Sequence, residues 1–327
     1  MVKLGVWLPV FGGWLPSRGS NMAQDVGTYA TGEEEEKSPT YGYIKQVALE
    51  AERIGVDSLW IPDHMLNRIK GDRTPCIESW TLATAIAEVT ERVVIAHTTL
   101  NEASRYPAVL AKQATALNEI SNGRFWLSIG AGSFKREFAA YGLPFHKHDD
   151  RVARAQETIQ IIKRLWEVDG VNFSGEYYSI SNGILEPKPE PRLPIWYAGG
   201  SEASRDLVAE EVDGWLMGGC SLERAQKNII DMGERLKKKG RNKIEFAIPG
   251  LTVIRDTDEA AKKYVEQITG GSKDLLENTL DTGWVGSPET IAQKIKQLES
   301  VGINHVLLQL SPTLRELQQV EKVRYLL

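Results

Sequence analysis

The chain has 327 residues, 42% of them hydrophobic and 25% charged, which is an ordinary composition for a folded globular protein. Its formal net charge is −5 and its lysines are scattered, so nucleic acid is not expected as a partner. No apolar run reaches the roughly 20 residues that a membrane span needs, and Cys76 and Cys220 lie far apart without CxxC spacing. We therefore expect a cytoplasmic protein with no signal peptide and no membrane partner.

Short β-rich runs alternate with helical patterns from the start of the chain to its end. The expected strands span residues 4–8, 58–61, 93–97, 124–129, 195–198, 214–217, 245–254 and 304–310. The expected helices span residues 43–53, 78–89, 109–120, 151–166, 201–211, 221–239, 257–268 and 287–298. Three long connections, at 12–39, 169–192 and 270–286, do not fit this alternation and suggest functional lids or disordered segments.

Eight strands interleaved with helices predict an α/β fold, an eight-stranded parallel (β/α) TIM barrel with insertions at its C-terminal face. We expect one domain over residues 1–327, closed by pairing of the strand at 4–8 with residues 306–310. An open doubly wound sheet is the alternative, but no G-x-G-x-x-G follows the first strand.

A glycine turn between the fifth strand and its helix suggests an anion site. Gly199, Gly200 and Ser201 follow a short apolar run and precede an amphipathic helix. Unpaired backbone N–H groups and the helix dipole at such a start bind anions, most often phosphate. Ser201 and Ser204 add hydroxyl groups, and glycine lets a phosphate approach the backbone. The alternative is a plain turn with Ser201 as the helix N-cap.

Many short segments, in order along the chain, resemble the luciferase-like flavin monooxygenases. They include Tyr106-Pro-Ala-Val-Leu-Ala-Lys112, Ile120-Ser-Asn-Gly-Arg124, Ile129-Gly-Ala-Gly132, Glu137 to Phe145, Phe173-Ser-Gly-Glu-Tyr-Tyr178, Trp196-Tyr-Ala-Gly-Gly-Ser201, Asp213-Gly-Trp215 and Val285-Gly-Ser-Pro-Glu289. Three further segments resemble the alkanesulfonate and dimethylsulfone monooxygenase branch: Trp7-Leu-Pro-Val-Phe-Gly-Gly-Trp-Leu15, His148-Asp-Asp-Arg151 and Leu185-Glu-Pro-Lys-Pro189.

The resemblance implies a flavin at the C-terminal mouth of the barrel. The flavin phosphate would lie at Gly199, Gly200 and Ser201, and the turn Gly130-Ala131-Gly132 would face its ring or ribityl chain. His97 and Thr98 fall, to within one residue, where the family often has a non-prolyl cis bond. The residues expected to bind the cofactor are His97, Thr98, Gly130, Ala131, Gly132, Gly199, Gly200, Ser201, Trp215 and Gly218.

The same resemblance implies a two-component monooxygenase that uses reduced FMN and oxygen on a small organic substrate, with organosulfur compounds among the candidates. A flavin reductase would supply the reduced FMN, and a homo-oligomer is expected. The first alternative is a hydride-transfer oxidoreductase that uses a deazaflavin coenzyme. The second is a non-catalytic flavin-binding protein on the same barrel.

Asp63 and His64, directly after the second strand, are candidate catalytic residues because histidine exchanges a proton near neutral pH. Neighbours at a strand end usually point apart, and a loop histidine with one structural hydrogen bond is the alternative. An Asp-His pair at this place is commoner in the deazaflavin branch of the family. The pair therefore favours the alternative chemistry over the sulfonate-like segments.

Arg151, at the start of the fourth helix, is the third catalytic candidate because its guanidinium suits an anion. An exposed salt bridge is its alternative role. The nearby His146, His148, Asp149 and Asp150 suggest a metal site, but one short segment without a distant ligand makes this the weaker interpretation. No metal is expected, and Cys76 is not expected to be a nucleophile.

Overall fold

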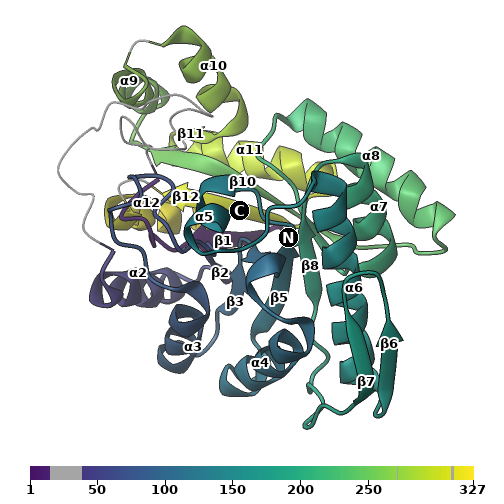
Figure 1. Cartoon of the computed structure of the whole chain (residues 1–327). Coiled ribbons are helices and arrows are strands. Elements are labelled where there is room, and N and C mark those ends of the chain that lie inside the picture. Colours follow the sequence, from purple (N-terminus) through teal and green to yellow (C-terminus); the bar gives the residue numbers. More distant parts are fainter. Residues whose placement is uncertain (15–38, 271, 311–312) are drawn as a thin grey trace.

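The structure is a computed structural model that describes residues 1–14, 39–270, 272–310 and 313–327. Eight parallel strands form a closed barrel, with helices between them (Figure 1). The barrel strands are β1 (Lys3–Trp7), β2 (Ser58–Ile61), β3 (Val94–His97), β5 (Phe125–Gly130), β8 (Ile195–Ala198), β9 (Gly214–Leu216), β10 (Glu245–Ile254) and β12 (His305–Leu310). The predicted barrel is confirmed.

The barrel closes between its first and last strands, as the sequence predicts. Leu4 lies opposite Val306, and Val6 lies opposite Leu308, in a parallel register. β10 completes the ring because it pairs with both β12 and β9. All carboxyl ends of the strands therefore meet at one face, where the loops after the strands come together.

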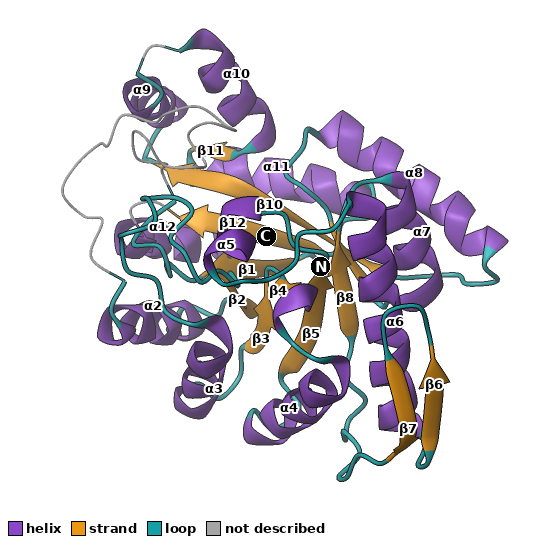
Figure 2. Cartoon of the chain, in the orientation of Figure 1, coloured by secondary structure: helices purple, strands orange, loops and turns teal. Residues whose placement is uncertain are grey.

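Helices surround the strands on the outside, as Figure 2 shows in purple around orange. They are α2 (Tyr41–Arg53), α3 (Ser79–Val89), α4 (Pro107–Ile120), α6 (His148–Glu167), α7 (Glu202–Glu211), α8 (Leu222–Lys238), α9 (Asp258–Ile268), α11 (Pro288–Ser300) and α12 (Thr313–Leu326). The apolar faces of all these helices except α9 contribute to the largest core cluster, and α9 packs in two smaller clusters. A separate cluster of side chains from the strands contains Trp60, Trp196 and Leu307.

Several elements lie in segments that the sequence pattern predicts as connections. A short strand, β4 (Leu100–Asn101), a 3₁₀ turn, η1 (Glu102–Ser104), and a helix, α5 (Lys135–Ala140), follow barrel strands. An antiparallel hairpin, β6 (Val171–Ser174) with β7 (Ser179–Gly183), fills most of 169–192.

Helix α10 (Lys273–Thr282) and strand β11 (Trp284–Gly286) occupy most of 270–286, so the long connection expected there contains secondary structure of its own. The expected connection at 12–39 lies mostly outside the described residues. Across the described part of the chain, no helix is both long and apolar enough to cross a membrane.

Candidate active site

A cavity of about 430 Å³ opens at the carboxyl ends of the barrel strands. Its walls come from the segments after β2, β3, β5, β8 and β9 and from the start of α6. Ten of the residues expected at the site line it: Asp63, His64, Thr98, Gly130, Ala131, Gly132, Arg151, Gly199, Gly200 and Gly218. His97, Ser201 and Trp215 do not line it.

His64 is held at the cavity wall by a carboxylate from a distant part of the chain. Its Nδ1 lies 3.2 Å from Oε2 of Glu137, on α5. Glu137 is buried, and its other oxygen accepts hydrogen bonds from the backbone N–H groups of Met65 and Leu66. A carboxylate accepts and does not donate, so Nδ1 carries the proton and Nε2 is left as the basic nitrogen.

The ring of His64 also has aromatic neighbours. Its centroid lies 5.7 Å from that of Phe11 and 5.9 Å from that of Phe134. These apolar rings reduce the access of water to one side of the imidazole. The arrangement suits a group that exchanges a proton with a molecule bound at the cavity wall.

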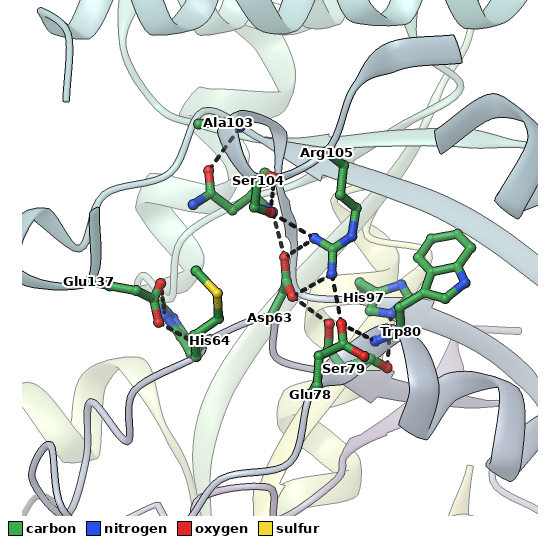
Figure 3. Close-up of polar contacts among 12 residues, drawn as sticks. Asp63, His64, Glu78, Ser79, Trp80, His97, Ala103, Ser104, Arg105 and Glu137 are labelled. Carbon is green, nitrogen blue, oxygen red and sulfur yellow. Dashed lines mark hydrogen bonds and ion pairs between the residues drawn. The ribbon is translucent and has the colours of Figure 1, made fainter. Parts of the chain in front are cut away.

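Asp63 points away from His64 and into a network that joins three loops (Figure 3). Its carboxylate accepts two hydrogen bonds from the Arg105 guanidinium, at 2.6 and 3.0 Å. It also accepts hydrogen bonds from the Ser79 hydroxyl and, at 2.8 Å, from the Asn101 backbone N–H. Burial opposes ionisation, but the charge and hydrogen bonds of Arg105 outweigh it and hold the pKa of Asp63 below its ordinary value.

Asp63 is therefore an ionised anchor, and no hydrogen bond between it and His64 is present in the described structure. Asp63 and His64 therefore do not act as a pair. The carboxylate that contacts His64 is that of Glu137. Cys76 contributes no thiolate beside them, because burial and the charge of Glu137 raise the pKa of its thiol to about 11.

Arg151 is buried at the first turn of α6 and lies against the ring of Phe145, 4.1 Å from its centroid. One terminal nitrogen donates to the backbone carbonyl of His146 at 2.6 Å. Its Nε is buried without a hydrogen-bond partner among the described residues. A buried guanidinium with an unused donor at a cavity wall suits an anionic or strongly accepting ligand, so the exposed salt bridge is not its role here.

The glycine turn before α7 has the geometry of a capped helix start. Ser201 is the N-cap: its hydroxyl accepts from the Ser204 backbone N–H at 3.2 Å and donates to the Ser204 hydroxyl at 3.0 Å. Ser204, rather than Ser201, lines the cavity. Trp215 supports the turn from behind, because its indole N–H donates to the Gly199 carbonyl at 2.9 Å.

Two glycines of the cavity wall have no packing reason to be glycine. A Cβ added to Gly200 or Gly218 would meet no atom of the protein within 4 Å. A Cβ on Gly199, by contrast, would lie 2.5 Å from the Ser204 hydroxyl oxygen. The bare backbone at Gly200 and Gly218 therefore borders open space, and no neighbouring side chain requires glycine at either position.

The His97 ring lies in the barrel wall instead of the cavity. It stacks on Trp80, with 5.5 Å between centroids and 8° between planes, and its Nε2 lies 3.4 Å from the Ser79 carbonyl. A cis peptide bond joins Thr98 to Thr99, one bond beyond the His97–Thr98 position implied by the resemblance.

Two further cavity residues carry polar groups that the sequence pattern does not single out. Tyr197 is fully buried, and burial raises the pKa of its hydroxyl to about 12, an effect that the neighbouring Ser204 side chain opposes. Asn101 lines the wall between His64 and the Gly132 turn. The described residues contain no group of three or more His, Cys, Asp or Glu side chains that could hold a metal ion.

Comparisons with known proteins agree with this architecture. The family model described as luciferase-like monooxygenase matches residues 11–305. The F420-dependent glucose-6-phosphate dehydrogenase of Amycolatopsis mediterranei (strain U-32) is 35% identical over 227 residues, which cover 69% of this chain and 62% of that protein. The FMNH2-dependent dimethylsulfone monooxygenase of Pseudomonas fluorescens (strain Pf0-1) is 28% identical over 234 residues, which cover 62% of this chain and 64% of that protein.

The chain thus spans somewhat less than two thirds of the length of these two relatives. The solved structure of EDTA monooxygenase from Chelativorans sp. BNC1 superimposes with a TM-score of 0.80 at 16% identity, covering 99% of this chain and 93% of that one. This likeness supports the fold alone. Because the family model covers most of the barrel, the chain belongs to the luciferase-like monooxygenase family, whose members are flavin-dependent monooxygenases or oxidoreductases.

Proposed function

We propose that the protein is a two-component monooxygenase that uses reduced FMN, delivered by a flavin reductase, to oxygenate a small organic molecule. The observation that carries this proposal is the pairing of His64 with Glu137 at the wall of a cavity that is also lined by several glycines. The FMNH2-dependent relatives support the choice of cofactor and partner, and a small organosulfur compound is the substrate class that they suggest.

The residues of the cavity fit a flavin phosphate. Gly199 and Gly200 lie at the start of α7, where the first N–H groups of a helix have no partner within the helix. The Arg151 Nε is a buried polar group of the same cavity without a partner among the described residues. An anion that accepted hydrogen bonds from these groups would remove the cost of leaving them unpaired.

The other glycine turn fits the flat end of a flavin. Gly130 is the last residue of β5, and Gly132 has a φ of +71°, which few side chains tolerate. With the phosphate at α7, Gly130-Ala131-Gly132 and Thr98 would hold the ribityl chain and ring. Gly218, also bare, would border the same cofactor, whereas Ser201 and Trp215 would act through the turn that they cap and support.

Reduced FMN, when bound, supplies the electrons with which molecular oxygen is split between the substrate and water. His64 holds or gives one proton at Nε2, because Glu137 occupies Nδ1. Phe11 and Phe134 limit the water around that ring. Arg151 binds negative charge at the cavity wall, and Asp63 keeps the loop of His64 in place through Arg105.

A second candidate is hydride transfer with a deazaflavin coenzyme, and the His64–Glu137 pair also supports it. Oxidation of an alcohol by hydride transfer needs a base for the hydroxyl proton, and a neutral imidazole whose Nδ1 is held by a carboxylate is such a base. The 35% identity with an F420-dependent dehydrogenase points the same way.

Binding of the two cofactors distinguishes these candidates. The purified protein would be titrated separately with FMN and with F420, following flavin fluorescence, and oxygen uptake would be measured with reduced FMN, a flavin reductase and a panel of small organosulfur compounds. We expect binding of FMN and substrate-dependent oxygen uptake. Tight binding of F420 with no affinity for FMN would overturn the monooxygenase proposal in favour of hydride transfer. Binding without turnover of either kind would favour a non-catalytic flavin-binding protein.

A further inference from the structure

A second cavity, of about 190 Å³, lies on the other side of Glu137 from the main cavity. Asp63, Asn101 and Glu137 line both cavities and so form the wall between them. Glu78, Ser104 and Arg105 line the far side of the smaller cavity, which we call the polar chamber. The Glu78 side chain is 49% exposed, so the chamber reaches bulk solvent at that end.

The lining of the polar chamber makes it a place for water. Three carboxylates and a guanidinium contribute to its walls. One water molecule takes about 30 Å³ of the liquid, and waters in polar cavities hydrogen-bond to two to four wall groups. A chamber of this size has room for several water molecules, and such waters would connect Glu137 with the exposed carboxylate of Glu78.

The three carboxylates of the chamber differ in what neutralises them. Asp63 is fixed by Arg105, which holds its pKa below the ordinary value. Burial of Glu78 is outweighed by hydrogen bonds from the N–H groups at the start of α3 and by Arg105, so its pKa is also lowered. Among the described residues, the ion-pair partner of Glu137 is His64, a group that itself gains and loses a proton. Glu137 is thus the carboxylate of the chamber that contacts His64.

We infer that the polar chamber is a water-filled route by which His64 exchanges protons with bulk solvent while the main cavity is occupied, and that Glu137 passes those protons. The inference rests on the proposed function, which gives His64 its role as proton carrier. A bound cofactor and substrate would cover the Nε2 side of the ring, whereas the Nδ1 side faces Glu137 and the chamber behind it.

Each step of the route moves one proton and no electron. A proton accepted at Nε2 converts the imidazole to imidazolium, and the Nδ1 proton then passes to Oε2 of Glu137. The neutral Glu137 acid gives that proton to a chamber water, which releases a proton to solvent beside Glu78. The ring is left with its proton on Nε2 and returns to the Nδ1–H form by exchange with water once the main cavity opens. The reverse sequence delivers a proton.

The test uses the full chain, labelled with ¹⁵N-histidine and saturated with oxidised FMN. Nuclear magnetic resonance would report the tautomer of His64 and the rate at which its ring N–H exchanges with water. We expect the Nδ1–H tautomer in the unaltered protein. Ser104→Val, which narrows the chamber, should slow the exchange several-fold and leave the tautomer unchanged. Glu78→Gln, at an exposed position, should also slow the exchange of the His64 ring N–H with water. This variant replaces Ser104→Val in the test if Ser104→Val does not fold.

Ser133→Val is the matched control, because Ser133 lines the main cavity but not the chamber. It should leave the exchange rate unchanged. Glu137→Gln should slow exchange and mix the two tautomers, since an amide can both donate and accept. An effect of Ser133→Val with none of Ser104→Val and Glu78→Gln would overturn the route.

None of these measurements needs turnover. If His64 proves to carry no proton in catalysis, His64→Asn will keep full activity, and this failure of the proposed function is recognised independently of the exchange rates.

Discussion

The His97 imidazole is a base enclosed in a wall from which water is excluded. Its ring lies between Trp80 and Phe125, and it has no exposed surface. Burial lowers its pKa from 6.5 to about 4, an effect that the charge of Asp63 opposes and that of Arg105 reinforces. The folded protein therefore keeps His97 neutral at pH values at which an unfolded chain would protonate it.

His97 should make the protein less stable in mild acid. Between pH 6.5 and about 4 the unfolded chain binds a proton that the folded protein refuses, so this contribution to stability is complete above pH 6.5 and is lost as the pH falls. The loss amounts to roughly 3 kcal/mol for a difference of this size. Urea unfolding at a series of pH values should show that loss in the unaltered protein and a smaller one in His97→Phe. Parallel pH curves for the two proteins would contradict the assignment.

Gly200 and Ser201 should affect different properties, although they are neighbours. The backbone of Gly200 is not in the left-handed region and has free space around it, so Gly200→Val should fold and lower flavin affinity more than tenfold, or about 1.4 kcal/mol. Ser201→Ala removes the N-cap of α7 and should cost about 1 kcal/mol of stability. Flavin titrations and thermal melts would separate the two effects.

Gly233→Val, in α8 and also without neighbouring atoms, is the control for Gly200→Val and should leave flavin affinity unchanged. Equal flavin affinity in Gly200→Val and Gly233→Val would remove the phosphate from the start of α7.

At the scale of single residues, the sequence predicts groups that belong to local motifs. The turn at Gly199 and Gly200 can be found because a strand, two glycines and a helix start are contiguous. Glu137 cannot be found in this way, because it meets His64 across 73 positions of sequence. The partner of Asp63 could not be predicted for the same reason: only the folded chain shows that it is Arg105 and not His64.

At the scale of elements, Asp63 joins the ends of β2, α3 and β4. It accepts hydrogen bonds from Ser79 and from Asn101, besides its two from Arg105. Asp63→Asn would leave a mostly buried guanidinium with the exposed Glu78 as its remaining carboxylate, and breaking such a pair costs about 3 kcal/mol. Glu78→Gln removes the exposed partner instead and should cost about 1 kcal/mol or less. Chemical unfolding of both variants tests this order; equal losses would contradict it.

The strands of the barrel could be predicted to within about one residue because each is a short apolar run between turn signals. The hairpin β6–β7 has a weaker pattern: Val171 and Phe173 are buried while Asn172 and Ser174 are exposed, over only four residues. Helix α10 likewise buries only Leu275 and Thr279 on its inner face. Short elements that depend on packing against an existing barrel carry little periodicity of their own.

For the whole molecule, the number of strand–helix units is enough to predict closure, since eight parallel strands can pair the first with the last. Closure then places every loop that follows a strand at one face. The site at that face could be predicted in outline from its strand ends, but the identity of the partners around His64 depends on side chains from loops whose paths the sequence does not reveal. The central claim is that His64, in the cavity at this face, takes up or releases a proton during turnover.

The most direct test of this claim is the turnover of His64→Asn, measured together with its thermal melt and flavin titration. Because Nε2 would no longer be present to hold a proton, we expect turnover to fall by roughly 10²–10⁴ while folding and flavin affinity are retained. His146→Asn, an exposed histidine outside the cavity, is the matched control and should turn over normally. Full activity in a stable His64→Asn protein would contradict the account and leave Arg151 as the remaining candidate at the cavity wall.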